Sequence, residues 1–361
     1  MRPTQKLHDL GQSIWLDNIT RDLLDNGTLR RYVQDFSITG LTSNPTIFDG
    51  AIGGGNAYDA GIHEKSQAGN SGEPLFVELA LEDLRRAADL FLPTFEASDH
   101  VDGWVSMELS PLLAGDTAGS VAAARQIYKQ ADRPNLFVKI PGTREGVPAI
   151  EESIFNGVPI NVTLLFSCEQ YLAAAEAYLR GIERRLEAGL DLRLPSVASL
   201  FVSRWDVAVN DEVPAELRNK LGIAMAGRTY RAYRDLLASR RWLKLASAGA
   251  KPQRLLWAST GTKDPNASAT LYVEALAAPD TIDTIPEKTL LAFAERGAIR
   301  SVMAVDGGDA EAMLTRFSDV GIDIDALALH LQQQGAESFV KSWKQLLQRI
   351  ADKSVTLASA N

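Results

Sequence analysis

The chain has little of what disulfide-linked, metal-binding and membrane proteins need. Cys168 is its only cysteine, so no intrachain disulfide can form, which fits a reducing compartment. The four histidines (His8, His63, His100 and His330) are scattered, and none has metal-ligand spacing from another or from the cysteine. No apolar stretch reaches the roughly 18 residues that span a bilayer, and the N-terminus lacks the apolar core of a signal peptide. We therefore expect a cytoplasmic protein with no membrane segment and no metal.

Basic residues are also in short supply. The 37 lysines and arginines against 46 acidic residues give a net charge of −9, whereas nucleic-acid-binding proteins usually have a basic excess. We therefore expect no nucleic-acid partner, although a local basic pocket for a small phosphorylated ligand remains compatible with this charge. No phosphate-binding loop ending in Gly-Lys-Ser/Thr is present, and the glycines of "AIGGGNAYDAG" do not fit the dinucleotide-binding fingerprint.

Short apolar runs alternate with longer amphipathic ones along most of the 361 residues. The expected strands are residues 13–18, 39–44, 103–109, 135–141, 159–166, 195–202, 254–260 and 281–286. Helical patterns lie between them, including residues 77–95, 117–131 and 167–189; the last opens with Ser167 and has Gln170 three residues on, as in a capping box.

Eight strands alternating with helices predict an α/β fold, a (β/α)8 barrel with extra helices. No linker divides the chain, so we expect a single catalytic domain over residues 1–361, with a C-terminal helix and short tail over about 335–361. A doubly wound sheet is the competing fold. It would normally carry a glycine-rich turn after the first strand, where this chain has "LDNITRDLLDNG".

Polar residues recur near the ends of these apolar strands. Lys139 lies within "LFVKIPGT", where a charge is unfavourable unless it is paired or takes part in chemistry. In a barrel, catalytic groups lie at the C-terminal ends of the strands, and alternate residues share a face. The candidates of this kind are Asp17, Asn44, Glu108, Lys139, Asn161, Thr163, Ser199 and Ser259.

Each candidate also has a purely structural interpretation. Asp17 could be the N-cap of the following helix, and Asn44 before a proline is ordinary turn chemistry. Glu108 and Lys139 could form a structural ion pair across neighbouring strands. Thr163 is a normal strand residue. A whole set of such groups at one barrel mouth is harder to explain by structure alone, because each buried polar group needs a partner.

The lysine suggests the chemistry of this set. A desolvated lysine near other charges keeps some amine uncharged at neutral pH, and that amine can attack a ketone or an aldehyde. The resulting iminium is an electron sink that lets a neighbouring carbon–carbon bond break or form. Glu108 and Asp17 could divide the proton transfers that this reaction needs.

At these residues the chain resembles a known family. The segments "GLTSNPTIFDGAI", "VSMELSPLLAGDTAGSVAAARQIY", "NLFVKIPGTREGVPAIEESIFNGVPINVTLLFS", "SVASLFVSRWD" and "WASTGTKDP" closely resemble the transaldolase family in its longer bacterial form. The resemblance runs from about residue 10 to about residue 300 in the same order. It implies a cofactor-free barrel enzyme, a transferase of the pentose phosphate pathway in carbohydrate metabolism. Such an enzyme moves a dihydroxyacetone unit from sedoheptulose 7-phosphate to glyceraldehyde 3-phosphate.

The resemblance also implies catalytic roles. Lys139 would form the Schiff base. Glu108 would carry protons through a water held partly by Thr163, and Asp17 would be the acid/base on the sugar hydroxyl.

Substrate-binding roles follow in the same way. Asn44 and Asn161 would hydrogen-bond the three-carbon unit, and Ser199 and Phe201, which share a strand face, would line the same pocket with Ser259.

Two cations would bind the phosphate. Arg204 in "FVSRWD" resembles a phosphate ligand of the family. Shorter transaldolases carry an arginine soon after "AS" on the seventh strand, whereas this chain offers Lys263 slightly later, which leaves the second ligand in doubt. Either residue could instead be a solvated surface charge.

Three other functions stay open. The barrel could release the three-carbon unit to water as a fructose 6-phosphate aldolase, although that family is much shorter. It could be a non-catalytic barrel that binds sugar phosphates. The third, a metal-dependent aldolase, would need clustered histidines, which this sequence lacks. We expect a monomer or a homodimer acting on small sugar phosphates.

Overall fold

A computed structural model describes residues 1–359 and contains a closed barrel of eight parallel strands in the order β1 to β8. The strands are β1 Ser13–Asp17, β2 Ile38–Thr42, β3 Val105–Glu108, β4 Leu136–Pro141, β5 Ile160–Leu165, β6 Ser196–Phe201, β7 Gln253–Ala258 and β8 Ile282–Ile285. The ends of each strand lie within two residues of those expected from its apolar pattern, and the prediction of a (β/α)8 barrel is confirmed. Strands β8 and β1 pair directly, which closes the barrel and leaves no exposed strand edge.

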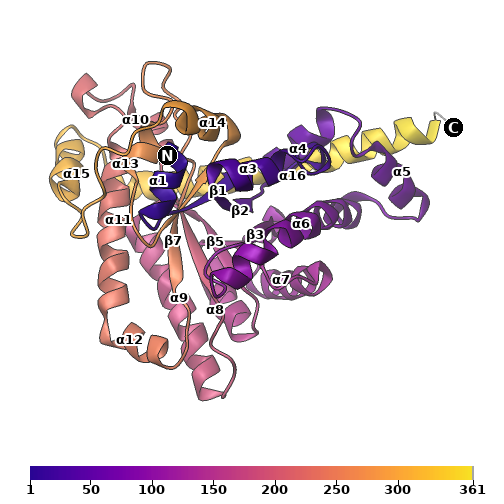
Figure 1. Cartoon of the computed structure of the whole chain (residues 1–361), viewed down its shortest axis with the longest axis horizontal. Helices are drawn as coiled ribbons and strands as arrows, with labels where there is room; N and C mark the ends of the chain where they lie inside the picture. Colours follow the sequence, from indigo (N-terminus) through magenta and orange to yellow (C-terminus); the bar gives the residue numbers. More distant parts are fainter. Residues whose placement is uncertain (360–361) are drawn as a thin grey trace.

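Helices surround the barrel and fill the connections between its strands (Figure 1). They are α1 Pro3–Asp9, α2 Arg21–Asp25, α3 Thr28–Phe36, α4 Pro45–Gly53, α5 Asp59–Gln67, α6 Gly72–Ala97, α7 Thr117–Ala131, α8 Gly146–Phe155, α9 Cys168–Glu187, α10 Ser203–Val209, α11 Leu221–Ala238, α12 Arg240–Ser247, α13 Leu271–Ala275, α14 Glu287–Arg296, α15 Ala310–Asp319 and α16 Ile324–Ser359. The capping box expected at the start of α9 is present, with the Ser167 hydroxyl accepting from the Gln170 amide. Within residues 1–359, no helix is both long and apolar enough to cross a membrane.

Aromatic side chains fill the lower part of the barrel interior. The rings of Trp104 and Phe137 stack with centroids 3.9 Å apart, and Trp15 lies 6.2 Å from Phe137. Gly40 of β2 leaves room for the Trp15 ring, because a Cβ there would lie 2.7 Å from Trp15 Nε1. Lys139 shares its strand face with Phe137, two residues further along β4. The packed rings therefore form a floor, and the polar residues lie above it.

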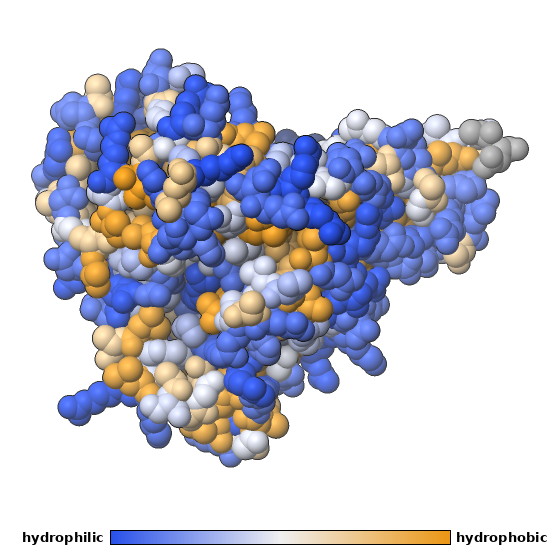
Figure 2. All heavy atoms as spheres, in the orientation of Figure 1, coloured by the Kyte–Doolittle hydropathy of each residue, from blue (hydrophilic) through white to orange (hydrophobic). Residues whose placement is uncertain are grey.

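The last helix extends the barrel into a projecting arm. Figure 1 shows α16 running from the barrel into a projection that also contains α4 and α5. Aromatic rings connect α16 to α4 through α6. The ring centroids of Trp343 (α16) and Phe76 (α6) are 5.1 Å apart, and those of Phe76 and Phe48 (α4) are 5.3 Å apart. Arg349 adds an ion pair to Asp49 at 2.6 Å. On the visible face, hydrophilic side chains cover most of the arm (Figure 2).

Helix α16 begins well before the position expected from the sequence. It starts at Ile324, whereas the C-terminal helix was expected from about residue 335. The end of the expected tail, residues 360–361, lies outside the described residues. The additional helical turns lie over the mouth of the barrel, where they contact strand ends β4 and β5.

Candidate active site

A cavity of about 290 Å³ opens at the C-terminal ends of the strands. Strand alternation turns the polar residue near each strand end into the barrel, so these side chains meet although they are far apart in sequence. The sequence-predicted residues that line it are Asp17, Asn44, Lys139, Thr163, Ser199, Phe201, Arg204, Ser259 and Lys263. Glu108 and Asn161 lie behind this lining and contact it through Lys139 and Ser199.

Lys139 is held at the base of the cavity by two oxygen atoms. Its Nζ donates to the Ser43 carbonyl at 3.0 Å and to Glu108 Oε2 at 3.3 Å. Glu108 is directly opposite Lys139 in the parallel pairing of β3 and β4, and both side chains are buried. Burial raises the pKa of Glu108. The positive charge of Lys139 opposes this increase, and the charge of Asp17 adds to it. Glu108 is therefore suited to hold and deliver a proton beside the amine.

Asp17 lies on the other side of the cavity. Its Oδ1 accepts a hydrogen bond from Thr42 Oγ1 at 2.8 Å, and Thr42 is 2.6 Å from the hydroxyl of Thr284. Burial raises the pKa of Asp17, and the charge of Lys139 is the largest opposing influence. The N-cap interpretation of Asp17 is wrong, because Thr20 caps α2 by accepting from the Leu23 amide.

Asn44 has a structural contact as well as a place in the cavity. Its Oδ1 accepts from the Ile47 amide at 3.0 Å and caps α4, and Pro45 follows as the first helical residue. The cap uses the carbonyl oxygen, so the amide nitrogen is the group left for a ligand.

Ser199 and Thr163 form the far wall, and Asn161 lies behind Ser199. The Asn161 amide donates to Ser106 Oγ at 3.1 Å and accepts from Ser199 Oγ at 2.7 Å, and this side chain is fully buried. Thr163 Oγ1 is also buried, but it has no hydrogen-bond partner among residues 1–359. A hydroxyl that lines a cavity without a partner can bind water or a substrate hydroxyl.

The cationic end of the cavity contains Arg204 and Lys263. Arg204 is partly buried on α10, with its guanidinium carbon 5.6 Å from the centre of the Phe201 ring. Burial lowers the pKa of Arg204, and no carboxylate pairs with it in the described chain. Lys263 is exposed at the rim. Between them, Ser259 adopts a left-handed backbone conformation (φ 57°) and its hydroxyl lies 2.9 Å from that of Ser203. An unpaired arginine in a cavity is suited to bind an anion.

Sequence reasoning missed several residues of the cavity. Thr42 and Thr284 could have been found, because each lies at alternate spacing near the end of an expected strand. Phe339 lines the cavity from α16, and Gln332 of the same helix contacts two strand ends. No local pattern marks these two residues, because they reach the mouth only through the packing of α16.

Cys168 and the metal-ligating residue types lie apart from this chemistry. Cys168 is buried at the start of α9, does not line the cavity, and burial raises its pKa to about 11. In the described part of the chain, no three His, Cys, Asp or Glu side chains come together as metal ligands could.

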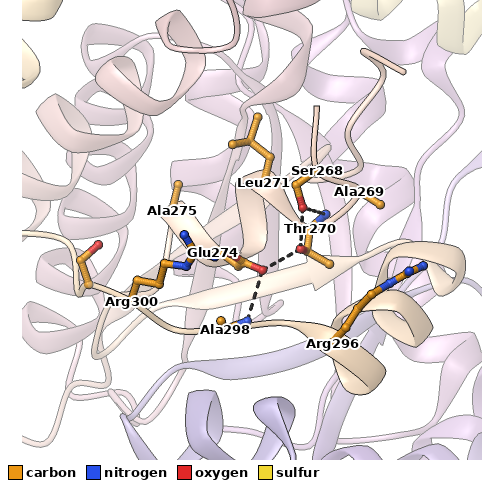
Figure 3. A pocket seen from close by; sticks show the side chains of 10 residues that line it. Ser268, Ala269, Thr270, Leu271, Glu274, Ala275, Arg296, Ala298 and Arg300 are labelled. Atoms are coloured by element: carbon orange, nitrogen blue, oxygen red, sulfur yellow. Dashed lines mark hydrogen bonds between the residues drawn. The ribbon is translucent and has the colours of Figure 1, made fainter. Parts of the chain in front are cut away.

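A larger hollow of about 730 Å³ lies between α13 and the segment after α14 (Figure 3). Its one carboxylate, on Glu274, already accepts from Thr270 Oγ1 at 2.7 Å and from the Ala298 amide at 3.2 Å. Figure 3 shows Arg296 and Arg300 at its edges, and both are exposed. None of the sequence-predicted residues lines it. The smaller cavity at the strand ends is therefore the candidate active site.

Comparison with known proteins agrees with this geometry. The family model described as "Transaldolase/Fructose-6-phosphate aldolase" matches residues 14–350. The chain is 43% identical to a transaldolase of Arthrobacter sp. (strain FB24), over 99% of this chain and 98% of the relative. It is 44% identical to a transaldolase of Thermobifida fusca (strain YX), over 97% of this chain and 98% of the relative. It is 38% identical to transaldolase 2 of Nostoc punctiforme, over 98% of each chain.

Proposed function

The chain belongs to the transaldolase/fructose-6-phosphate aldolase family, and we propose that it is a transaldolase of the non-oxidative pentose phosphate pathway. In this reaction a dihydroxyacetone unit passes from sedoheptulose 7-phosphate to glyceraldehyde 3-phosphate, giving erythrose 4-phosphate and fructose 6-phosphate. One observation carries the proposal: a buried lysine lies in the candidate cavity between two carboxyl groups whose pKa values are both raised by burial.

The reaction begins at Lys139. Its amine attacks the ketone of the donor sugar, and the carbinolamine then loses water. Glu108, beside the amine, protonates the leaving hydroxyl of the carbinolamine. The proton passes through a second water molecule held by the free hydroxyl of Thr163. An iminium now links Lys139 to the sugar.

The bond cleavage belongs to Asp17. Its carboxylate takes the proton from the hydroxyl next to the bond that breaks, and the electron pair of that bond moves into the iminium to form an enamine. Erythrose 4-phosphate leaves, and the enamine attacks the aldehyde of glyceraldehyde 3-phosphate while Asp17 returns the proton. Hydrolysis of the new iminium releases fructose 6-phosphate.

The remaining lining residues hold the substrate. We assign the hydroxyls of the three-carbon unit to Asn44 and Ser199, with Asn161 acting behind the lining through its hydrogen bond to Ser199, while Phe201 and Ser259 shape the wall. Arg204 and Lys263 bind the phosphate, supported by the absence of a carboxylate partner for Arg204 in residues 1–359.

We further propose that residues 1–361 form one catalytic domain, acting in the cytoplasm as a monomer or homodimer. One closed sheet from β1 to β8, with α16 packed across its mouth, supports the single domain.

The family also contains fructose 6-phosphate aldolases, which release the three-carbon unit to water. The near-complete alignment with relatives named transaldolase favours transfer to an aldehyde acceptor. Incubation with fructose 6-phosphate, with and without erythrose 4-phosphate and in excess chelator, distinguishes the two. We expect rapid product formation only with the acceptor.

Trapping the intermediate tests the lysine. Borohydride added with fructose 6-phosphate should reduce the iminium and leave a three-carbon adduct on the peptide that contains "VKIPGT". Lys139→Arg should form no adduct, because a guanidinium stays protonated. As a matched control, Lys263→Arg should still form it. An adduct on another lysine, or none in an active preparation, would refute the proposal.

A further inference from the structure

The backbone that presents Thr163 to the cavity has an unusual conformation. Leu164 has a φ of +58°, a left-handed value that a leucine rarely adopts. At the same place the pairing of β5 with β6 shifts register between Val162 and Leu165. Such a conformation persists only where the surrounding structure holds it.

Helix α16 provides that support. One nitrogen, Nε2 of Gln332, donates to the Leu164 carbonyl at 2.9 Å and to the Gly142 carbonyl at 3.0 Å. The Gly142 amide in turn donates to the Thr163 carbonyl at 2.8 Å. Gly335, one turn along α16, packs so closely that a Cβ there would lie 2.8 Å from Leu164 Cδ2. The carbonyls of Thr163 and Leu164 are thus both tied into one network around Gln332.

We infer that Gln332 is a positioning residue for Thr163: it fixes the strained Leu164 peptide and so sets the direction of the Thr163 hydroxyl in the cavity. This inference rests on the proposed function. The Thr163 hydroxyl is buried, lines the cavity and has no partner in the described chain, so its direction depends on the backbone that carries it. A displacement of about 1 Å in a catalytic group can cost on the order of 100-fold in rate.

The neighbouring glutamine provides a matched control. Gln333 lies on the same helix and is exposed, and within residues 1–359 its amide donates a hydrogen bond only to Glu337 of that helix, at 2.9 Å. Gln332→Ala and Gln333→Ala therefore make the same chemical change, with and without loss of the contacts to the barrel.

The experiment is a double-mutant cycle with Thr163→Val, which removes the hydroxyl and keeps the branched shape. Single-turnover formation of the borohydride-trapped adduct and steady-state KM are measured for each variant. We expect Gln332→Ala to slow adduct formation roughly 10-fold in the wild-type background, to leave KM within about two-fold, and to have less than a two-fold effect beside Thr163→Val. Gln333→Ala should change neither quantity.

Equal losses in the two backgrounds, or a rise in KM alone, would overturn the inference. Gln332→Met, which keeps length and helix propensity but has no donor, should reproduce the result if the alanine variant does not fold. If neither Gln332 variant folds, Gln332 serves the fold and the inference is wrong. If the wild type itself formed no adduct, the proposed function would fail first, and the inference with it.

Discussion

The two carboxyl groups at the cavity have different neighbours. Glu108 contacts the amine of Lys139, whereas Asp17 is held by the hydroxyl of Thr42. Burial raises the pKa of both, so each can exchange a proton more readily near neutral pH than an exposed carboxyl could. Position, more than acidity, therefore assigns Glu108 to Schiff-base formation and Asp17 to bond cleavage.

Neutral isosteres should separate these two steps. Asp17→Asn should still form the trapped adduct but lose about 10² to 10⁴-fold in bond cleavage, the usual size of a general-base contribution. Glu108→Gln should slow adduct formation instead. Rapid-quench kinetics measure both steps, with Asp22→Asn, outside the cavity, as the control. Unchanged cleavage in Asp17→Asn would remove the aspartate from the mechanism.

The arginine of the cavity should act on substrate binding rather than on chemistry. The phosphate lies far from the breaking bond, so its contacts act mainly in holding the substrate. Arg204→Ala should raise KM for fructose 6-phosphate steeply and leave a donor without phosphate nearly unaffected, and Lys263→Ala should do the same more weakly. Arg300→Ala, at the other hollow, is the control. Equal losses on both donors would mean that Arg204 supports the fold.

At the scale of the elements, the sequence predicts strands and the faces of their side chains, but not contacts that depend on how a helix packs against distant strands. Apolar runs located all eight strands, and alternation placed Lys139 and Thr163 on the cavity side, because a strand has a period of two residues. The start of α16 and the contacts of Gln332 and Phe339 were not predictable in this way. They depend on a helix packing across strands that lie more than 160 residues away in the chain.

The fit between β2 and the aromatic floor can be tested with two glycines. A Cβ on Gly40 would lie 2.6 Å from the Trp104 carbonyl oxygen and 2.7 Å from Trp15 Nε1, neither of which can easily move. Gly40→Ala should therefore lower the free energy of unfolding by about 1–3 kcal/mol. Gly50 lies inside α4 with nothing within 4 Å of its Cβ position, so Gly50→Ala should be neutral or raise stability by up to about 1 kcal/mol. Urea unfolding gives both values, and equal effects would contradict the packing argument.

At the scale of the whole molecule, one buried acid links stability to pH. Asp283 of β8 is fully buried, and because Thr284 faces the cavity, Asp283 faces the surrounding helices. Thr260 donates to its Oδ1 at 2.8 Å, while Oδ2 has no partner among the described residues. Burial raises the pKa of Asp283 to about 7, against the smaller effect of the Thr260 hydrogen bond.

The direction of the pH effect follows from proton binding. In the unfolded chain an aspartate loses its proton near pH 4, but in the folded protein Asp283 keeps it until about pH 7. Between these values the folded state binds more protons, so this residue makes the free energy of unfolding fall as pH rises. One pKa unit corresponds to about 1.4 kcal/mol, so the full decrease is on the order of 4 kcal/mol.

Asp283→Asn should remove this dependence. The amide is neutral at every pH and resembles the protonated acid, with an oxygen to accept from Thr260 and a nitrogen in place of the unpartnered oxygen. We expect the variant to match the wild type only at about pH 4 and below, and its advantage to grow as the pH rises, reaching a few kcal/mol near pH 8, as measured by urea unfolding from pH 4 to pH 8. Asp319→Asn changes an exposed aspartate and should leave the wild-type pH profile intact. Parallel stability profiles for Asp283→Asn and the wild type would mean that Asp283 is already ionised in the folded protein, and that its burial does not determine how the barrel responds to pH.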